Sequence, residues 1–323
     1  MLTFGNVITA MVTPFYADGN INFEDFDSLA GHLLANGSDG LLIGGTTGEG
    51  ATLTEKEKLR LFRFAAEEYG DKALIIANIG SNNTATTVEF ARLAEETGVD
   101  CLLAIVPYYN KPNQDGCYAH FAAVAKACRL PVIIYNVPGR TGGKILPETV
   151  IRLAKEFPRI VGIKEAGGDL EAAAVIARDT GENFHVYSGD DSLTLPMTAV
   201  GGTGVISVVS HLIGKEMNAI VQNCKDGNMQ EATALHQQYI DVMTGIFTTV
   251  NPIPIKECCK MLGLISDNVF RLGCLRFQGF QLVLVLRDLL ADLGNLLVNA
   301  LDFILSHNQS LLLKNLYYQF IRP

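Results

Sequence analysis

The sequence predicts an α/β protein with a (β/α)₈ barrel followed by a helical C-terminal extension. Within residues 1–227, eight short apolar segments alternate with eight segments of helical periodicity. Most of these apolar segments are continuous runs, as expected for parallel strands that are covered on both faces. The rival fold, a doubly wound open sheet, predicts a glycine-rich phosphate loop after the first strand. Here the first strand leads to Thr13-Pro14-Phe15 instead, so the barrel is favoured.

The predicted strands begin at intervals of 19 to 33 residues, which suits repeated βα units. In chain order the predicted strands are 7–13, 40–44, 73–78, 101–106, 131–136, 160–165, 185–188 and 204–207. Several of the intervening segments carry helix-end signals, such as Gly37 as a stop, Thr54 with Glu57 as a capping box, and Pro147 in a first turn. The predicted helices are 23–36, 54–69, 84–97, 114–128, 147–157, 170–180, 192–200 and 214–226.

The chain divides into three regions by this pattern, namely a (β/α)₈ barrel in 1–227, a helical region in 228–272 and an atypical leucine-rich tail in 273–323. In the helical region, residues 229–249 and 252–262 are predicted helices. The 51-residue tail carries only seven charged residues, and its apolar residues over 281–305 have roughly helical spacing. We expect the tail to affect stability or assembly rather than chemistry.

The composition points to a cytoplasmic protein. The net charge of −9 argues against nucleic acid or an anionic membrane as a partner. The seven cysteines form no C-x-x-C pair, and their odd number and scattered placement fit reduced thiols. No signal-peptide pattern begins the sequence, and no run of about twenty apolar residues predicts a membrane span.

A lysine ends the sixth predicted strand, Ile160-Val161-Gly162-Ile163-Lys164. Taken alone, Lys164 is more simply a strand-end lysine that reaches into solvent, since most lysines are exposed. The alternative is a desolvated amine with a lowered pKa. Such an amine is a nucleophile whose characteristic reaction with carbonyl compounds forms a Schiff base.

Polar side chains also follow other predicted strands at the carboxyl end of the barrel, where barrel enzymes carry their catalytic groups. They are Thr46 and Thr47 after the second strand, Tyr108 and Tyr109 after the fourth, Tyr135 and Arg140 after the fifth, and Asp190 and Asp191 after the seventh. Each has a structural explanation by itself, such as a loop hydroxyl, a solvated arginine or a helix N-terminal carboxylate. Their gathering around Lys164 favours the catalytic interpretation. No pair of histidines or carboxylates suggests a metal, and we expect none.

The residue types suit Schiff-base chemistry. An imine-forming lysine needs a group that moves protons as water leaves and as the enamine forms. Tyr135 and Thr46 on adjacent barrel positions, with Tyr109 as the next member, fit such a proton relay. Arg140 keeps its charge at all relevant pH values and suits the carboxylate of a small keto acid or of its reaction partner.

Six motifs with the right order and spacing resemble the 4-hydroxy-tetrahydrodipicolinate synthase (dihydrodipicolinate synthase) family of class I pyruvate-dependent aldolases. They are Gly45-Thr46-Thr47-Gly48-Glu49, Pro107-Tyr108-Tyr109-Asn110-Lys111-Pro112, Tyr135-Asn136-Val137-Pro138-Gly139-Arg140-Thr141, Gly162-Ile163-Lys164-Glu165, Tyr187-Ser188-Gly189-Asp190-Asp191 and Gly204-Val205-Ile206-Ser207. Asn251-Pro252-Ile253-Pro254-Ile255-Lys256 in the helical region also fits. The resemblance runs from about residue 6 to residue 272. Because it stops there, it implies that the tail in 273–323 is a replaced terminus or a sequence read in another frame.

The resemblance implies a lyase of lysine and diaminopimelate biosynthesis that needs no cofactor beyond a covalent pyruvate–lysine imine. Pyruvate would form the Schiff base on Lys164, and its enamine would attack L-aspartate 4-semialdehyde. The implied catalytic residues are Lys164, Tyr135, Thr46 and Tyr109, with Tyr109 lent across a dimer interface. The implied substrate-binding residues are Thr47, Arg140, Gly189 and Ile206. The implied assembly is a homotetramer built as a dimer of dimers.

Two rival functions remain open. An N-acetylneuraminate lyase-like or other pyruvate-dependent aldolase shares the lysine and tyrosine, but that lyase typically has Gly-Ser-Thr-Gly-Glu and lacks the arginine. Thr46 and Arg140 therefore favour the synthase. The other rival is a catalytically inactive family member that acts as a scaffold. The resemblance also implies weak feedback by lysine, because Lys58 and Thr86 stand where strongly inhibited members carry histidine and glutamate, although Asn82 and Tyr108 are kept.

Overall fold

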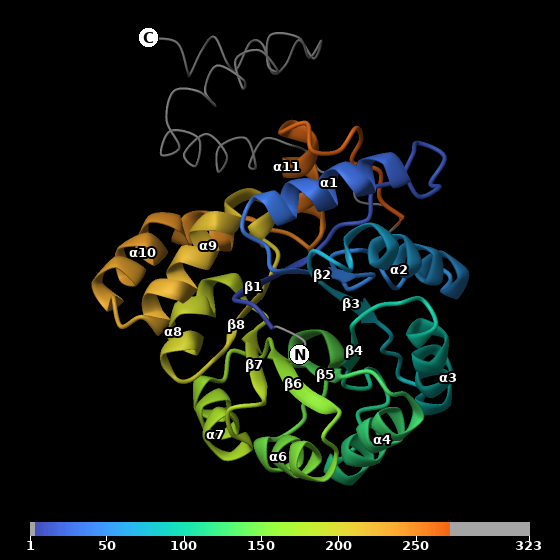
Figure 1. Ribbon diagram of the computed structural model, residues 1–323, viewed down its shortest axis with the longest axis vertical. Coiled ribbons are helices and arrows are strands. Elements are labelled where there is room, and N and C mark those ends of the chain that lie inside the picture. Colours follow the sequence, from blue (N-terminus) through green and yellow to red (C-terminus); the bar gives the residue numbers. More distant parts are fainter. Residues whose placement is uncertain (1–3, 272–323) are drawn as a thin grey trace.

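A computed structural model describes residues 4–271 and contains a closed barrel of eight parallel strands ringed by helices (Figure 1). Each strand pairs with the next in sequence, and β8 closes the barrel against β1. The strands are β1 Val7–Ala10, β2 Gly40–Ile43, β3 Leu74–Asn78, β4 Cys101–Ile105, β5 Val132–Asn136, β6 Ile160–Glu165, β7 His185–Ser188 and β8 Gly204–Ser207. This is a TIM barrel followed by helices, as the sequence predicts.

The helices cover the outside of the barrel and continue beyond it. They are α1 Phe23–Ala35, α2 Glu55–Tyr69, α3 Thr84–Glu95, α4 Gln114–Ala127, α5 Pro138–Thr141, α6 Pro147–Glu156, α7 Leu170–Thr180, α8 Thr194–Ala199, α9 Ser210–Lys225, α10 Met229–Gly245 and α11 Ile253–Met261. The capping box is confirmed: Thr54 Oγ1 accepts from the Glu57 amide, and the Glu57 carboxylate accepts from the Thr54 amide.

Two predicted helices need correction, and one short helix was not predicted. The helix predicted over 229–249 ends at Gly245. The segment predicted as one helix over 192–200 is a 3₁₀ turn, Asp191–Leu193, followed by α8. The short helix α5 was not predicted. Helix α9 includes a break at Ile213, where the backbone is non-helical (φ −131°, ψ 46°), so its regular part begins at Gly214, as the sequence predicts. Gly214 also allows close packing, because a Cβ there would lie 2.3 Å from the Asn36 carbonyl oxygen at the end of α1.

Two apolar cores explain why the strands are continuously hydrophobic. One core fills the barrel interior and includes Ile8, Leu42, Leu103 and Ile206. The other lies between the barrel and the helices and includes Phe26, Leu33 and Phe62. Since successive side chains of a strand point to opposite faces, each strand contributes to both cores.

The helical extension packs back on the barrel. Helices α10 and α11 both contact α9, and α10 also contacts α8 (Figure 1). The segment that joins α10 to α11 reaches the carboxyl end of the barrel, where Phe247 and Asn251 line a pocket. The predicted helix over 281–305 and the rest of the tail lie outside the described residues.

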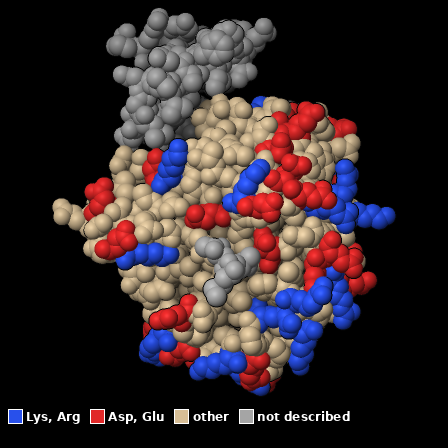
Figure 2. All heavy atoms as spheres, viewed as in Figure 1, with Lys and Arg blue, Asp and Glu red and all other residues tan. Residues whose placement is uncertain are grey.

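The surface shows no single field of charge on the face drawn in Figure 2, where acidic and basic side chains are intermingled. Among residues 4–271, every helix is too short or too polar to cross a membrane.

Candidate active site

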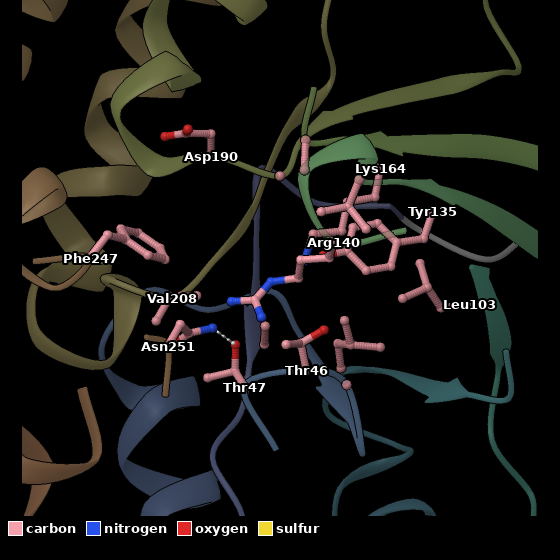
Figure 3. A pocket seen from close by; sticks show the side chains of 16 residues that line it. Thr46, Thr47, Leu103, Tyr135, Arg140, Lys164, Asp190, Val208, Phe247 and Asn251 are labelled. Carbon is pink, nitrogen blue, oxygen red and sulfur yellow. Dashed lines mark hydrogen bonds between the residues drawn. The ribbon is translucent and has the colours of Figure 1, made fainter. Parts of the chain in front are cut away.

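A pocket of about 180 Å³ opens at the carboxyl end of the barrel (Figure 3). Its apolar part comes from strand residues such as Ala10, Leu42 and Leu103. Its polar part comes from the loops that follow the strands, as is usual for this fold. The polar lining includes Thr46, Thr47, Tyr135, Arg140, Lys164, Asp190 and Asn251.

Lys164 lies inside the barrel near the end of β6. It is 5% exposed, and its Nζ is 4.8 Å from the centroid of the Tyr135 ring. The strand register places Lys164 beside Tyr135 of β5 and Tyr187 of β7. Burial lowers the pKa of Lys164 to about 8; the Asp191 carboxylate raises it, and the nearby Arg140 charge lowers it further. A substantial fraction of this amine is therefore neutral and nucleophilic near neutral pH.

Gly189 makes room for the lysine. A Cβ at this position would lie 3.1 Å from Lys164 Cε and 2.6 Å from Ala166 Cβ. The Gly189 amide donates to the Glu165 carbonyl at 2.7 Å, which ties the end of β7 to the end of β6. Any larger residue at 189 would force Ala166 or the Lys164 side chain to shift, so this predicted substrate-binding position also shapes the surroundings of Lys164.

Tyr135 and Thr46 are brought together as the sequence predicts. Tyr135 is 7% exposed. Burial raises the pKa of its phenol, while the Arg140 charge and a side-chain hydrogen bond with Thr46 lower it. Because the phenol ring also faces Lys164 Nζ, Tyr135 lies between the amine and the Thr46 hydroxyl. This arrangement suits proton transfer.

The loop that carries Thr46 and Thr47 is tightly folded. Its backbone amides at Glu49 and Gly50 donate to the carbonyls of Thr46 and Gly45 at 3.1 and 2.9 Å. A Cβ on Gly50 would lie only 1.9 Å from the Gly44 carbonyl oxygen, so only glycine fits there. Two side chains from neighbouring segments hold the same loop. Asn78 of β3 donates to the Gly44 carbonyl, and Thr13, after β1, donates to the Gly48 carbonyl.

Arg140 lies on α5, the four-residue helix that follows β5. The helix ends at Gly142, which adopts a left-handed conformation with φ 73°. In Figure 3 the Arg140 side chain extends across the pocket, from the side of Tyr135 toward Thr47 and Asn251. Its charge lowers the pKa of both Lys164 and Tyr135, so the guanidinium lies close to both groups. A cation held there can bind a carboxylate.

Comparison with known proteins supports a single family. The model of the dihydrodipicolinate synthetase family matches residues 3–278. The chain belongs to the dihydrodipicolinate synthetase family. It is 47% identical to the 4-hydroxy-tetrahydrodipicolinate synthase of Bacillus subtilis, over 83% of this chain and 92% of that protein. It is 51% identical to the enzyme of the same name from Listeria welshimeri, over 89% of this chain and 99% of that protein.

Solved structures agree with this family membership. The crystal structure of dihydrodipicolinate synthase from Bacillus anthracis superposes with a TM-score of 0.86 at 42% identity, covering 90% of this chain and 99% of that chain. The enzyme from Cyanidioschyzon merolae, crystallised with lysine bound, has a TM-score of 0.86 at 43% identity, covering 90% and 98%.

Two of the eight predicted site residues do not line the pocket. Tyr109 is 88% exposed and adopts a left-handed backbone with φ 70°, which is uncommon for a side chain of this size. Ile206 is fully buried in the barrel interior, among the lumen residues. The other six predicted residues, Lys164, Tyr135, Thr46, Thr47, Arg140 and Gly189, line the pocket.

Sequence reasoning assigned no role in the site to Asn251, Phe247 or Val208, which also line the pocket. In the sequence, Asn251 appears only as part of a family motif. The rule that site residues follow barrel strands does not select a residue from the helical extension. Asp191, interpreted as a helix N-terminal carboxylate, is buried and accepts from the amides of Val208 and Val209, just before α9. Its burial raises its pKa to about 6.

Within residues 4–271, no three or more His, Cys, Asp or Glu side chains are grouped so as to hold a metal ion.

Proposed function

We propose that this chain is a 4-hydroxy-tetrahydrodipicolinate synthase that condenses pyruvate with L-aspartate 4-semialdehyde. Relatives of that name are about half identical to it over most of its length. The observation that carries the chemical proposal is Lys164, a buried amine with a lowered pKa at the mouth of a barrel. The proposed reaction makes the protein a lyase of the aldolase type in lysine biosynthesis.

Lys164 supplies the covalent step in this proposal. Its neutral amine adds to the carbonyl carbon of pyruvate, and the resulting carbinolamine loses water to form an imine. Loss of a proton from the methyl carbon gives an enamine. That carbon then bonds to the aldehyde carbon of the semialdehyde, whose oxygen takes up a proton. The amino group of the semialdehyde next attacks the imine carbon, which closes the ring and releases Lys164.

Tyr135, Thr46 and Tyr109 form the proton relay of this proposal. Tyr135 would exchange protons with the carbinolamine, which is supported by the 4.8 Å distance between its ring centroid and Lys164 Nζ. Thr46 would be the next member, which is supported by its effect in lowering the pKa of the Tyr135 phenol. Tyr109 would come from a second copy of the chain, which is supported by its high exposure and its absence from the pocket of its own chain.

The substrates of the proposed reaction each carry a carboxylate. Arg140 would bind the carboxylate of the semialdehyde near the entrance, as a guanidinium binds carboxylates in two-point contacts. Thr47 and Ile206 would contact the pyruvyl group, and Gly189 would contact substrate beside the lysine. Ile206 would act from below the pocket, since it is buried in the barrel interior.

We also propose a homotetramer, built as a dimer of dimers, in the cytoplasm. The exposed Tyr109 supports the dimer, since a relay member outside its own pocket needs a partner chain. The six free cysteines among the described residues support a reducing compartment. The proposed chemistry needs no resident cofactor or metal, because the protonated imine itself draws electrons from the adjacent carbon.

The test is reduction with borohydride in the presence of pyruvate, followed by peptide mass mapping. We expect one covalent pyruvyl adduct, on Lys164, and none without pyruvate. The unmodified chain should then consume aspartate 4-semialdehyde and leave N-acetylmannosamine unchanged. An unlabelled Lys164 would refute the aldolase proposal. An adduct combined with a preference for N-acetylmannosamine would instead favour the lyase.

A further inference from the structure

The helical extension makes a direct contact with the pocket. Asn251, in the segment between α10 and α11, donates from Nδ2 to Thr47 Oγ1 at 2.9 Å. The two residues are 204 positions apart in sequence, and both line the pocket (Figure 3). Asn251 is 6% exposed and Thr47 3%, so bulk water competes little for this bond.

The direction of this hydrogen bond decides what the Thr47 hydroxyl can do. A hydroxyl has one proton and two lone pairs, and the Asn251 amide occupies a lone pair. Among residues 4–271, no acceptor for the Thr47 hydroxyl proton lies within hydrogen-bond distance. The proton is therefore available to a group in the pocket. A carboxylate is the natural acceptor there, since Arg140 lines the same space.

Asn251 is a costly choice for a residue that only fills space. Its Oδ1 is buried and has no hydrogen-bond partner among the described residues. Burying an unpaired carbonyl oxygen is unfavourable, so an apolar side chain of similar size would serve packing better. The amide group makes sense if the bond from Nδ2 to Thr47 is what matters at this position.

A buried ion pair fixes the two segments to each other. Lys256 Nζ of α11 lies 2.7 Å from Glu49 Oε1, and both side chains are 0% exposed. Glu49 follows Thr47 by two residues, and Lys256 follows Asn251 by five. The other Glu49 oxygen accepts from the Arg271 amide at 2.8 Å. The loop and the extension are thus joined at Glu49 as well as at the Asn251–Thr47 bond, which limits their relative movement.

We propose that Asn251 is a positioning residue that holds the Thr47 hydroxyl as a hydrogen-bond donor toward the substrate carboxylate. This inference rests on the proposed function, because it assumes that a pyruvate-derived anion occupies the pocket. It assigns to the helical extension a part in substrate binding. Asn251 acts through Thr47 and does not itself take part in the chemical step.

The test is a double-mutant cycle on the full chain with Asn251→Ala, Thr47→Val and the two combined. Each single change should raise the KM for pyruvate roughly tenfold, with a smaller effect on kcat, because one hydrogen bond to an anion is lost or misdirected. The double variant should match Thr47→Val alone. If the KM increases of the two single variants multiply in the double variant, the proposal is overturned, since Asn251 would then act independently of Thr47.

A second variant tests the direction of the bond. Asn251→Asp offers only acceptors near neutral pH, so the Thr47 hydroxyl would turn toward it and away from substrate. We expect its KM for pyruvate to exceed that of Asn251→Ala. A KM equal to that of the unmodified chain would overturn the proposal. Asn251→Leu fills the same space without polar atoms and replaces Asn251→Ala in the cycle if that variant does not fold.

Two controls keep the outcomes distinct. Asn228→Ala removes an exposed asparagine from the same region and should leave the KM for pyruvate unchanged. Borohydride trapping of the unmodified chain tests the proposed function separately. If that chain forms no pyruvyl adduct, the proposed function fails. If it forms the adduct and Asn251→Ala binds pyruvate as tightly as the unmodified chain, only the role of Asn251 is refuted.

Discussion

Two lysines are buried in the described part of this chain, and their surroundings differ sharply. Lys256 has Glu49 at 2.7 Å, the Val269 carbonyl at 2.7 Å and the Phe15 ring at 4.3 Å from Nζ. Lys164 is nearly as buried, yet among residues 4–271 it has no carboxylate or carbonyl acceptor within bonding distance, and its one close partner is the Tyr135 ring. A fully paired buried charge supports structure, whereas an unpaired one is available for reaction.

The same contrast appears between the two ends of the barrel. At the amino end, the Asp39 carboxylate accepts from the amides of Asn6 and Val7, and the Tyr187 hydroxyl donates to the Gly5 carbonyl at 2.7 Å. Tyr135 occupies the same register row as Tyr187 but faces the pocket. Polar groups at the amino end are therefore satisfied by protein. Those at the carboxyl end are arranged around a space that a substrate can enter.

Exchanging Lys164 for methionine should have the largest effect on activity. Lys164→Met removes the nucleophile, and we expect condensation activity to fall by at least about a thousandfold. Thermal unfolding should show unchanged or increased stability, because an unpaired buried amine is replaced by an apolar chain of similar length. A steady-state assay with a melting curve on one sample checks both. Substantial residual turnover would contradict the assigned role.

Exchanging Lys256 for methionine should do the opposite. Lys256→Met removes the ammonium group that neutralises the buried Glu49 carboxylate, and breaking such an ion pair costs about 3–5 kcal/mol of unfolding free energy. Denaturant unfolding measures this loss. Combining Lys256→Met with Glu49→Gln should restore part of it, since no lone charge then remains. If Lys256→Met unfolds at the same denaturant concentration as the unmodified chain, the ion pair has no structural role.

Exchanging Arg140 for lysine should have a smaller effect on activity. This effect should be confined to the binding of aspartate 4-semialdehyde. A lysine keeps the charge but loses the two-point geometry, so we expect the KM for aspartate 4-semialdehyde to rise roughly tenfold. The yield of the pyruvyl adduct at saturating pyruvate should change little. Steady-state kinetics and borohydride trapping on the same preparation separate an effect on semialdehyde binding from an effect on adduct formation. A large loss of adduct would instead place Arg140 in the pyruvate step.

Lysine feedback gives the smallest expected effect. Lys58 lies partly buried on α2, with its Nζ 5.7 Å from the Phe90 ring centroid. A cationic side chain at this position should repel the ammonium of a bound lysine, so we expect weak or absent inhibition. An activity titration with lysine checks this, and half-inhibition at sub-millimolar lysine would contradict it.

The parts of the fold set by local pattern were predictable from sequence. Strands β6, β7 and β8 have the predicted bounds, because continuous apolar runs between turn residues mark buried strands. The regular part of α9 begins at Gly214 as predicted, but the turn Ser210–Ile213 before the break was not predicted, because no sequence signal separates it from the loop after β8.

The candidate site was predictable where its residues end strands. Lys164, Tyr135 and Thr46 follow from counting strands, since all βα loops meet at one end of the barrel. Asn251 and Lys256 could not be placed in this way. Their partners, Thr47 and Glu49, are more than 200 residues away, and neither residue belongs to a strand-end pattern. Tyr109 follows a strand but is exposed, so its predicted role depends on a second chain.

The lowered pKa of Lys164 should also make the stability of the folded chain depend on pH. Its pKa is about 8 in the folded chain and 10.5 as the ordinary value. Below about pH 8 the folded chain must hold a buried charge, so Lys164 lowers stability there. This penalty fades as pH rises from about 8 to about 10.5, where the unfolded chain still binds the proton. The neutral, reactive fraction rises over the lower part of the same range.

The most direct measurement is the initial rate of borohydride-trapped pyruvyl adduct formation between pH 6 and pH 9.5, quantified peptide by peptide. A buried, unpaired nucleophile predicts a single labelled peptide, containing Lys164, and a rate that rises with pH to a plateau with a midpoint near 8. Label on Lys256 or on another lysine, or a Lys164 rate that still climbs steeply at the highest pH as for an ordinary exposed amine, would contradict the account.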